Sequence, residues 1–378
     1  MDPYKPPKQR LLISRNIFGN YGPPIPIFSD LEINSQENWD IPETLCFNYI
    51  TDNIINTHTN KKLHQLIDMS NEGQGWITCG CSVGENGLVN CFDNPNCPCF
   101  EVNKTLEALQ KTDEQRPMRT QFKTFNHLNV RGLDEYFDTF AFCCSEKCAC
   151  QGACSNNVMY MTDKNAHRFE VYRYDEKGFG VRAMSYIPYG TPVIEFKGEL
   201  VEYKTCLERG SNDYSFQIKD KKLTKLENAS AKILKSIPGY DQNYAKLVKE
   251  TLCLPWYLDP KTNGNEARFI THGCLPNLSL IIAFKGGFSP HQMHCLMISS
   301  EDIYPGTQLT FDYGESYASQ HLSGNCLCET LTCQRNEEFK VIGLATHYSF
   351  IREHYFYCSF EIFTKNVNHI YTTHIEIC

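Results

Sequence analysis

The apolar and polar positions in the middle of the chain follow the short period of β-strands. Runs rich in β-branched and aromatic residues are bounded by glycine and proline, which place turns at their ends. Four such runs predict strands at 169–173, 191–196, 213–218 and 307–311. The predicted fold is therefore mainly β with small helices.

One stretch between these strands has a helical period instead. Apolar residues recur every three or four positions from Leu223 to Ile237, before Pro238 and Gly239 stop the run. This pattern predicts a helical insertion over residues 220–252. Residues 100–142 are polar, and we expect them to form a linker.

Composition and charge narrow the classes of protein that fit. The chain has 378 residues, 41% of them apolar, which is enough for about two or three domains with a real core. No run approaches the roughly 18 apolar residues of a membrane helix, and the first ten residues lack the apolar centre of a secretion signal. The formal charge is −8, which argues against direct DNA binding and suits a basic partner.

The 20 cysteines add a metal prediction, because reduced cysteines at this density usually bind metal. Nine thiolates can fill the twelve ligand positions of three zinc ions if three of them bridge. A disulfide framework is the alternative, although Cys-x-Cys pairs are poorly placed to bridge within themselves. The neighbouring Cys143 is expected to be a buried spare. The nine predicted ligands lie in two blocks: Cys79, Cys81, Cys91, Cys97 and Cys99, then Cys144, Cys148, Cys150 and Cys154.

Five further motifs follow the cysteine blocks along the chain: Lys177–Ala183, Gly198-Glu199, Asp213-Tyr214, Gly264–Asn277 and Leu309–Gly314. Their order is that of a SET domain. Together with the nine-cysteine block, they resemble SET-domain histone lysine methyltransferases of the suppressor-of-variegation branch, which have pre-SET and post-SET zinc regions. The resemblance covers roughly residues 13–333.

This resemblance implies a fold and a division of the chain. The fold would be a SET-type β fold with a knot-like threading of its C-terminal segment, next to a cysteine-rich zinc cluster. The implied parts are an N-terminal lead-in (1–78), the pre-SET zinc cluster (79–154), the SET domain (165–318, with the insertion 220–252), the post-SET region (326–333) and a C-terminal tail (334–378).

The resemblance also implies the site residues. Tyr313 corresponds to the catalytic tyrosine, and Tyr214 and Phe311 would line the lysine channel with it. The cofactor would be S-adenosyl-L-methionine. Its implied binding residues are Lys177, Gly178, Phe179, Tyr214, Thr271 and His272. A fourth zinc ion would be held by Cys274, Cys326, Cys328 and Cys333.

Elementary chemistry explains why such residues suit methyl transfer. A lysine amine attacks a methyl group only when neutral, and deprotonating it at pH 7 costs roughly 4.6 kcal/mol. A channel of aromatic rings lowers that cost by desolvating the ammonium. Phe311 has no hydroxyl to hold a water molecule, so the resemblance implies di- or trimethylation.

The partner and location follow from the same resemblance. We expect a substrate lysine on the histone H3 tail, of the lysine-9 type, in the nucleus on chromatin, with recruiting proteins that the sequence does not identify. The family's usual Asn-His-Ser-Cys motif reads Thr271-His272-Gly273-Cys274 here. Thr271 thus replaces an amide that contacts the cofactor in the family by a shorter hydroxyl. Two alternatives therefore stay open: a zinc-stabilised chromatin scaffold with an inactive SET domain, and a methyltransferase for a non-histone lysine.

Overall fold

A computed structural model describes most of the chain up to Cys333. Two compact units divide it: a larger unit of Met1–Thr271 with Asn277–Leu309, and a smaller unit of His272–Pro276 with Thr310–Cys378. The described residues are 10–17, 24–30, 45–55, 60–82, 91, 94–110, 121–124, 127–129, 139–154, 156–159, 162, 167–173, 178–210, 215–218, 223–235, 240–322, 326–328, 330 and 333. Lys177, Tyr214, Ile237 and the predicted tail 334–378 lie outside them.

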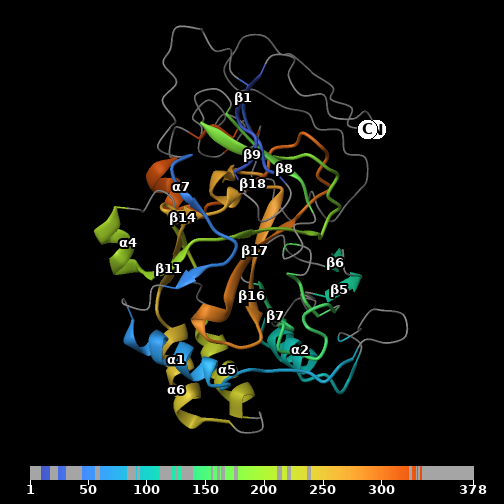
Figure 1. The fold of residues 1–378 in the computed structure, drawn as a ribbon, viewed down its shortest axis with the longest axis vertical. Helices are drawn as coiled ribbons and strands as arrows, with labels where there is room; N and C mark the ends of the chain where they lie inside the picture. The colour runs from blue at the N-terminus through green and yellow to red at the C-terminus, as the bar shows by residue number, and fades with distance from the viewer. Residues whose placement is uncertain are drawn as a thin grey trace, which may run out of the picture. The chain divides into compact units, whose positions relative to one another are not determined.

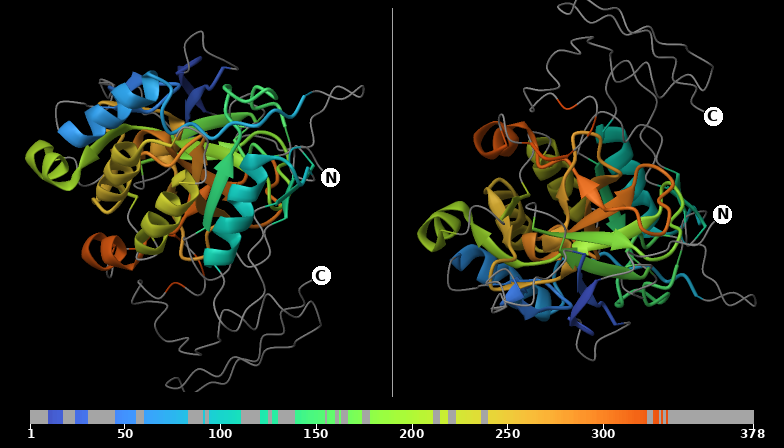
Figure 2. Two further views of the ribbon diagram at one scale, coloured as in Figure 1. Left: turned by 90° about the horizontal axis from the view of Figure 1, so that it is seen from below. Right: turned by 90° about the horizontal axis from the view of Figure 1, so that it is seen from above.

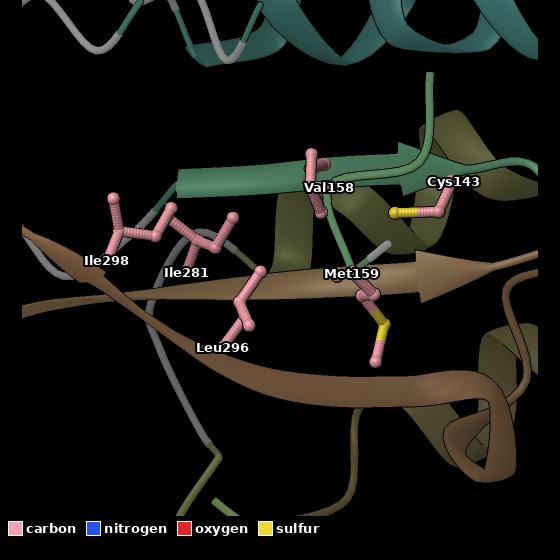
Figure 3. Close-up of a cluster of buried hydrophobic side chains, with 8 residues drawn as sticks. Cys143, Val158, Met159, Ile281, Leu296 and Ile298 are labelled. Carbon is pink, nitrogen blue, oxygen red and sulfur yellow. The ribbon is translucent and has the colours of Figure 1, made fainter. Parts of the chain in front are cut away.

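The larger unit has a central sheet in the order β10-β17-β16-β7, of which Figure 1 labels β17, β16 and β7. These strands are Pro192–Phe196, Met293–Ser299, Leu278–Lys285 and Thr139–Cys143. Nearly every residue of β16 and β17 is buried, which is the pattern of strands covered on both faces. Figure 3 shows part of this core, where Ile281 of β16 and Leu296 of β17 lie in one buried cluster with Val158 and Met159.

Two further four-stranded sheets complete the framework of the larger unit. One has the order β1-β2-β8-β9, with strands Leu11–Ser14, Ile27–Ser29, Phe169–Arg173 and Phe179–Ala183. The other has the order β12-β13-β11-β4, with strands Phe216–Gln217, Trp256–Asp259, Glu199–Glu202 and Ile54–Ile55. Short pairs join β14 (Asn263–Gly264) to β3 (Asn48–Tyr49) and β5 (Gln121–Thr124) to β6 (His127–Asn129).

The predicted helical insertion is present as two helices. They are α5 (Leu223–Lys235) and α6 (Gln242–Leu252), and α6 begins where the Asp241 side chain accepts a hydrogen bond from the Tyr244 amide at 2.7 Å. Helix α6 contacts both α5 and α1 (Lys61–Asn71), as Figure 2 shows. The remaining helix of this region is α4 (Tyr203–Arg209). Two 3-10 turns, η2 (Glu266–Phe269) and η3 (Pro290–Gln292), lie within the larger unit.

The linker predicted for residues 100–142 is wrong at both ends. Helix α2 (Pro98–Gln110) begins inside the first cysteine block, and β7 belongs to the central sheet. The buried Asn103 side chain joins them, because its Oδ1 accepts from the Phe142 amide at 2.8 Å and its Nδ2 donates to the Phe142 carbonyl at 2.6 Å. In the sequence, a polar asparagine suggests an exposed linker. Here its side chain is buried and bonds the backbone of β7.

Strand β15 (Thr271–His272) pairs with β18 (Thr310–Phe311). His272, Thr310 and Phe311 of this pair belong to the smaller unit. Helix α7 (Glu315–His321) follows Gly314, whose φ of 85° favours glycine. The sheet-rich fold with few helices and clustered cysteines confirms the predicted fold class. The knot-like threading stays a prediction. In the part of the chain that is described, no helix combines the length and the apolarity that crossing a membrane requires.

Candidate functional site

Tyr313 lies in a group of aromatic side chains in the smaller unit. Its ring centroid is 4.9 Å from Phe311, 5.3 Å from Tyr317 and 5.5 Å from His272. The Tyr317 and His272 contacts are edge-on, and Phe311 is buried. This arrangement restricts the Tyr313 ring and keeps its surroundings apolar.

His272 joins the Tyr313 backbone to a cysteine. The Tyr313 amide donates to His272 Nδ1 at 3.3 Å, and His272 Nε2 lies 3.3 Å from Cys274 Sγ. An imidazole that accepts at Nδ1 carries its proton at Nε2, so the Nε2–H group can donate to the Cys274 sulfur. The buried His272 ring therefore ties the position of Tyr313 to that of Cys274.

Four thiols of the smaller unit form a compact group. Their sulfur atoms all lie within 4.8 Å of one another, and Cys274 Sγ is 3.8 Å from Cys326 Sγ and 3.6 Å from Cys333 Sγ. A tetrahedral zinc site with Zn–S bonds of about 2.3 Å separates its sulfur atoms by about 3.8 Å. The spacing of these thiols thus fits zinc. The members are Cys274, Cys326, Cys328 and Cys333.

The larger unit brings the nine predicted pre-SET cysteines together. Eight of them form three overlapping groups of four that could each hold a metal ion, and Cys79 belongs to all three. The Cys79 sulfur is 3.8 Å from Cys91 and 3.9 Å from Cys144, again the spacing that zinc requires. Cys154, the ninth, lies within hydrogen-bonding reach of Cys91. The shared membership of the groups is what bridging thiolates would produce.

Two observations concern the disulfide alternative and Cys143. The described cysteines form no disulfide bonds, so none supports the disulfide framework. Cys143 lies in the buried apolar cluster with Val158 and Ile281 instead of the thiol groups (Figure 3). Both clusters could therefore bind zinc through the cysteines that the sequence singled out.

The predicted cofactor residues that are described in the larger unit lie at two places. Gly178 has a φ of 85°, and a Cβ atom built on it would meet nothing within 4 Å, so its backbone borders open space. Thr271 Oγ1 accepts a hydrogen bond from Gln308 Nε2 at 2.6 Å. The open space beside the Gly178 backbone would allow a ligand to approach it closely.

Three neighbours of the predicted residues were not identified from the sequence. Phe269 packs against Phe179 with ring centroids 5.9 Å apart, Gln308 binds Thr271, and Tyr317 contacts Tyr313. Phe269 lies inside the motif Gly264–Asn277, and Gln308 directly precedes the motif Leu309–Gly314. These positions were the only indication in the sequence that the two residues lie near the site. Tyr317 lies in α7, only four residues after Tyr313, and this short separation was its only signal in the sequence.

Comparison with known proteins identifies the domain. Residues 178–314 match the family model of the SET domain. The chain carries a SET domain. This match covers the motifs from Gly178 to Gly314, including Thr271, His272, Phe311 and Tyr313. The SET domain that the motifs predicted is therefore confirmed over residues 178–314.

Curated relatives of this SET-domain chain are histone-lysine N-methyltransferases. SUVR5 of Arabidopsis thaliana is 26% identical over 326 residues, which are 84% of this chain and 20% of that protein. The H3 lysine-9 specific SUVH4 of Arabidopsis thaliana is 25% identical over 263 residues, 67% of this chain and 39% of that protein. The chain thus spans well under half the length of these relatives.

Solved structures share the fold of this chain. KRYPTONITE in complex with mCHG DNA and SAH has a TM-score of 0.56 at 23% identity, covering 86% of this chain and 53% of that one. Arabidopsis thaliana SUVH6 in complex with SAM has a TM-score of 0.56 at 20% identity, covering 86% of this chain and 56% of that one. At these identities the similarity shows the fold.

Proposed function

We propose that this chain is an S-adenosylmethionine-dependent histone-lysine N-methyltransferase that acts on the H3 tail, at lysine 9. The observation that carries the proposal is the SET match, which ends at Gly314 and includes Tyr313 with its aromatic neighbours Phe311 and His272. The H3 lysine-9 specificity of SUVH4 supports the choice of lysine. The formal charge of −8 suits a basic tail.

The thirteen cysteines of the two clusters would hold zinc as scaffolds. Three ions would bind the nine pre-SET thiolates, with bridging, and one would bind the four thiolates of the smaller unit. Sulfur spacings of 3.6–4.0 Å in both clusters support this assignment. With every position filled by thiolate, neither cluster would bind substrate. The proposed boundaries of pre-SET, SET and post-SET parts are those predicted from the sequence.

The cofactor would be held by the residues that the SET motifs supply. Bound S-adenosylmethionine supplies a methyl group on a positively charged sulfur. The backbone at Gly178 allows close approach, and Phe179 is backed by Phe269. We assign Lys177, Gly178, Phe179, Tyr214, Thr271 and His272 to this site.

The protein's part in the reaction is to bind, neutralise and orient the lysine amine. The buried Phe311 ring next to Tyr313 disfavours the ammonium form by desolvation, and Tyr214 would add a third ring. The Tyr313 hydroxyl would hold the neutral amine with its lone pair toward the methyl group. His272 fixes the backbone that carries this hydroxyl. The ammonium would first lose its proton to water through the channel, so the step would need no buried general base.

A second candidate function rests on Thr271. Its hydroxyl is engaged by Gln308, so the side chain that replaces the usual amide is occupied within the protein. A SET domain that binds cofactor weakly and no longer turns over would serve as a zinc-stabilised chromatin scaffold. Both functions place the protein on chromatin in the nucleus.

Mass spectrometry of methylated peptides separates these functions. The protein is incubated with S-adenosylmethionine and an unmodified H3 tail peptide, and a matched peptide with lysine 9 replaced by arginine serves as control. Added methyl mass on the first peptide alone supports the proposal. Mass on both peptides contradicts the choice of lysine, and no mass on either from folded, zinc-loaded protein favours the scaffold.

A further inference from the structure

Residues 45–55, the part of the predicted lead-in 1–78 that is called the lead-in segment below, pair with strands of two SET motifs. They do so although they lie more than one hundred residues before the SET match. Its strand β3 runs parallel to β14, and its strand β4 runs parallel to β11. The Ile50 amide donates to the Gly264 carbonyl at 2.9 Å. Asn53 Oδ1 accepts from the Gly198 amide at 3.1 Å. The lead-in segment therefore bonds directly to two of the five motifs.

A row of three rings leads from the lead-in segment to the proposed cofactor loop. Phe47 meets Phe269 edge-on with centroids 5.8 Å apart, and Phe269 meets Phe179 with centroids 5.9 Å apart. Phe269 is only 6% exposed, so its ring is packed in the protein interior together with these two neighbours. Phe179 directly follows Gly178, whose backbone borders open space. Loss of the Phe47 ring would loosen the support of this loop.

A polar contact also holds the 3-10 turn η2, which carries Phe269. The Tyr49 hydroxyl donates to the Glu266 carboxyl group, which is 6% exposed. Burial raises the pKa of Glu266, and the hydrogen bond from Tyr49 opposes that rise by stabilising the carboxylate. The Arg268 guanidinium lies over the Phe47 ring at 4.3 Å. The turn η2 that carries Glu266 and Phe269 ends two residues before Thr271.

We infer that the lead-in segment is a positioning element for the cofactor site, acting through Phe47 and Tyr49 on the turn η2 and through Phe269 on Phe179. This inference rests on the proposed function, because it assigns the support of an S-adenosylmethionine site to residues outside the SET match. Phe47 and Tyr49 are positioning residues, since they act through Phe269 and Glu266. A purely structural role would lower stability without a selective change in cofactor affinity.

Calorimetric titration of the full chain with S-adenosylhomocysteine tests the inference. Phe47→Ala is expected to raise the Kd about three- to tenfold, the range set by the usual strength of an edge-on ring pair. Phe47→Tyr keeps the ring and should restore the wild-type Kd. In turnover assays, Phe47→Ala should raise the KM for S-adenosylmethionine and leave kcat at saturating cofactor close to that of the wild type.

The matched control is Tyr203→Ala. Tyr203 stacks on Tyr257 with centroids 5.4 Å apart in the same unit, and it is 46% exposed. This control should leave the Kd unchanged. An unchanged Kd in Phe47→Ala, or an equal loss in Tyr203→Ala, would overturn the inference while leaving the proposed function intact. A wild-type protein that binds no S-adenosylhomocysteine would overturn both.

Discussion

At the scale of single residues, His272 connects the four-thiol cluster of the smaller unit to Tyr313. Its imidazole accepts from the Tyr313 amide and lies next to Cys274 Sγ. His272→Ala leaves that amide without its acceptor, a loss of roughly 1–3 kcal/mol, and we predict that kcat falls about ten- to a hundredfold. Steady-state turnover on the H3 peptide at saturating cofactor measures this change.

The control for His272 is His321→Ala in the same unit. His321 is exposed at the end of α7 and stacks on Tyr317 with centroids 4.4 Å apart. Its removal should leave kcat within about twofold of the wild type, since exposed side chains contribute little. Equal kcat values for His272→Ala and the wild type would show that Tyr313 needs no support from the imidazole.

Phe311 is predicted to set the number of methyl groups. Its buried ring lies 4.9 Å from Tyr313, where an added hydroxyl could hold a water molecule and keep a methylated amine from turning. Phe311→Tyr should therefore shift the product from di- and trimethyl toward monomethyl lysine, with mass spectrometry as the measurement. An unchanged product distribution, as expected for the control Phe47→Tyr, would contradict this role.

Thr271 shows what the sequence could and could not predict at this scale. The loss of the usual amide at this position was evident from the motif. Its partner was not, because Gln308 lies 37 positions away and the bond of 2.6 Å depends on how the larger unit folds. Partners of this kind come from tertiary structure, which a local pattern does not contain.

At the scale of elements, prediction succeeded where the local pattern and the tertiary environment agree. The strand predicted at 169–173 is β8 with the same bounds, and the insertion 220–252 contains α5 and α6. The strand predicted at 213–218 is reduced to β12, Phe216–Gln217, within the described residues. The linker prediction failed because buried Asn103 bonds the backbone of β7, a role that polar composition conceals.

Strand β16 is predicted to be the most sensitive element to truncation of its side chains. Ile281 is fully buried between β17 and β7, so Ile281→Ala should lower the free energy of unfolding by about 2–5 kcal/mol. Leu207→Ala on α4 is the control. Leu207 is 48% exposed, and its removal should cost less than about 0.5 kcal/mol. Urea unfolding followed by tryptophan fluorescence measures both, and similar midpoints for the two variants would contradict the assignment of the core.

At the scale of the whole molecule, zinc is predicted to stabilise each of the two cysteine-rich regions from within. Elemental analysis should find about four Zn²⁺ per chain, three in the larger unit and one in the smaller. Cys328→Ser should lose about one ion and most of the activity, because this cluster positions Cys274 next to His272. Cys253→Ser, which alters an exposed cysteine outside every thiol group, should lose none. A full zinc content in Cys328→Ser would contradict the fourth site.

The cysteine clusters were predictable from the sequence because ligand spacing is a local property. All thirteen predicted ligands lie in or next to the thiol groups of the structure. The support of the SET motifs by the lead-in segment was not predictable, because Phe47 meets Phe269 across 222 positions of chain. The chemistry of local motifs can thus be predicted from the sequence, whereas the tertiary packing that positions those motifs cannot.

The central claim is that Tyr313 orients the lysine amine for methyl transfer. Its most direct test is the initial rate of methylation of the H3 peptide by Tyr313→Phe, with S-adenosylhomocysteine affinity measured on the same sample and Tyr186→Phe as the control for loss of an exposed hydroxyl. We predict that Tyr313→Phe loses at least about a hundredfold in rate while cofactor affinity and zinc content stay at wild-type values, and that the control keeps its rate. A Tyr313→Phe protein with the wild-type rate would contradict the account.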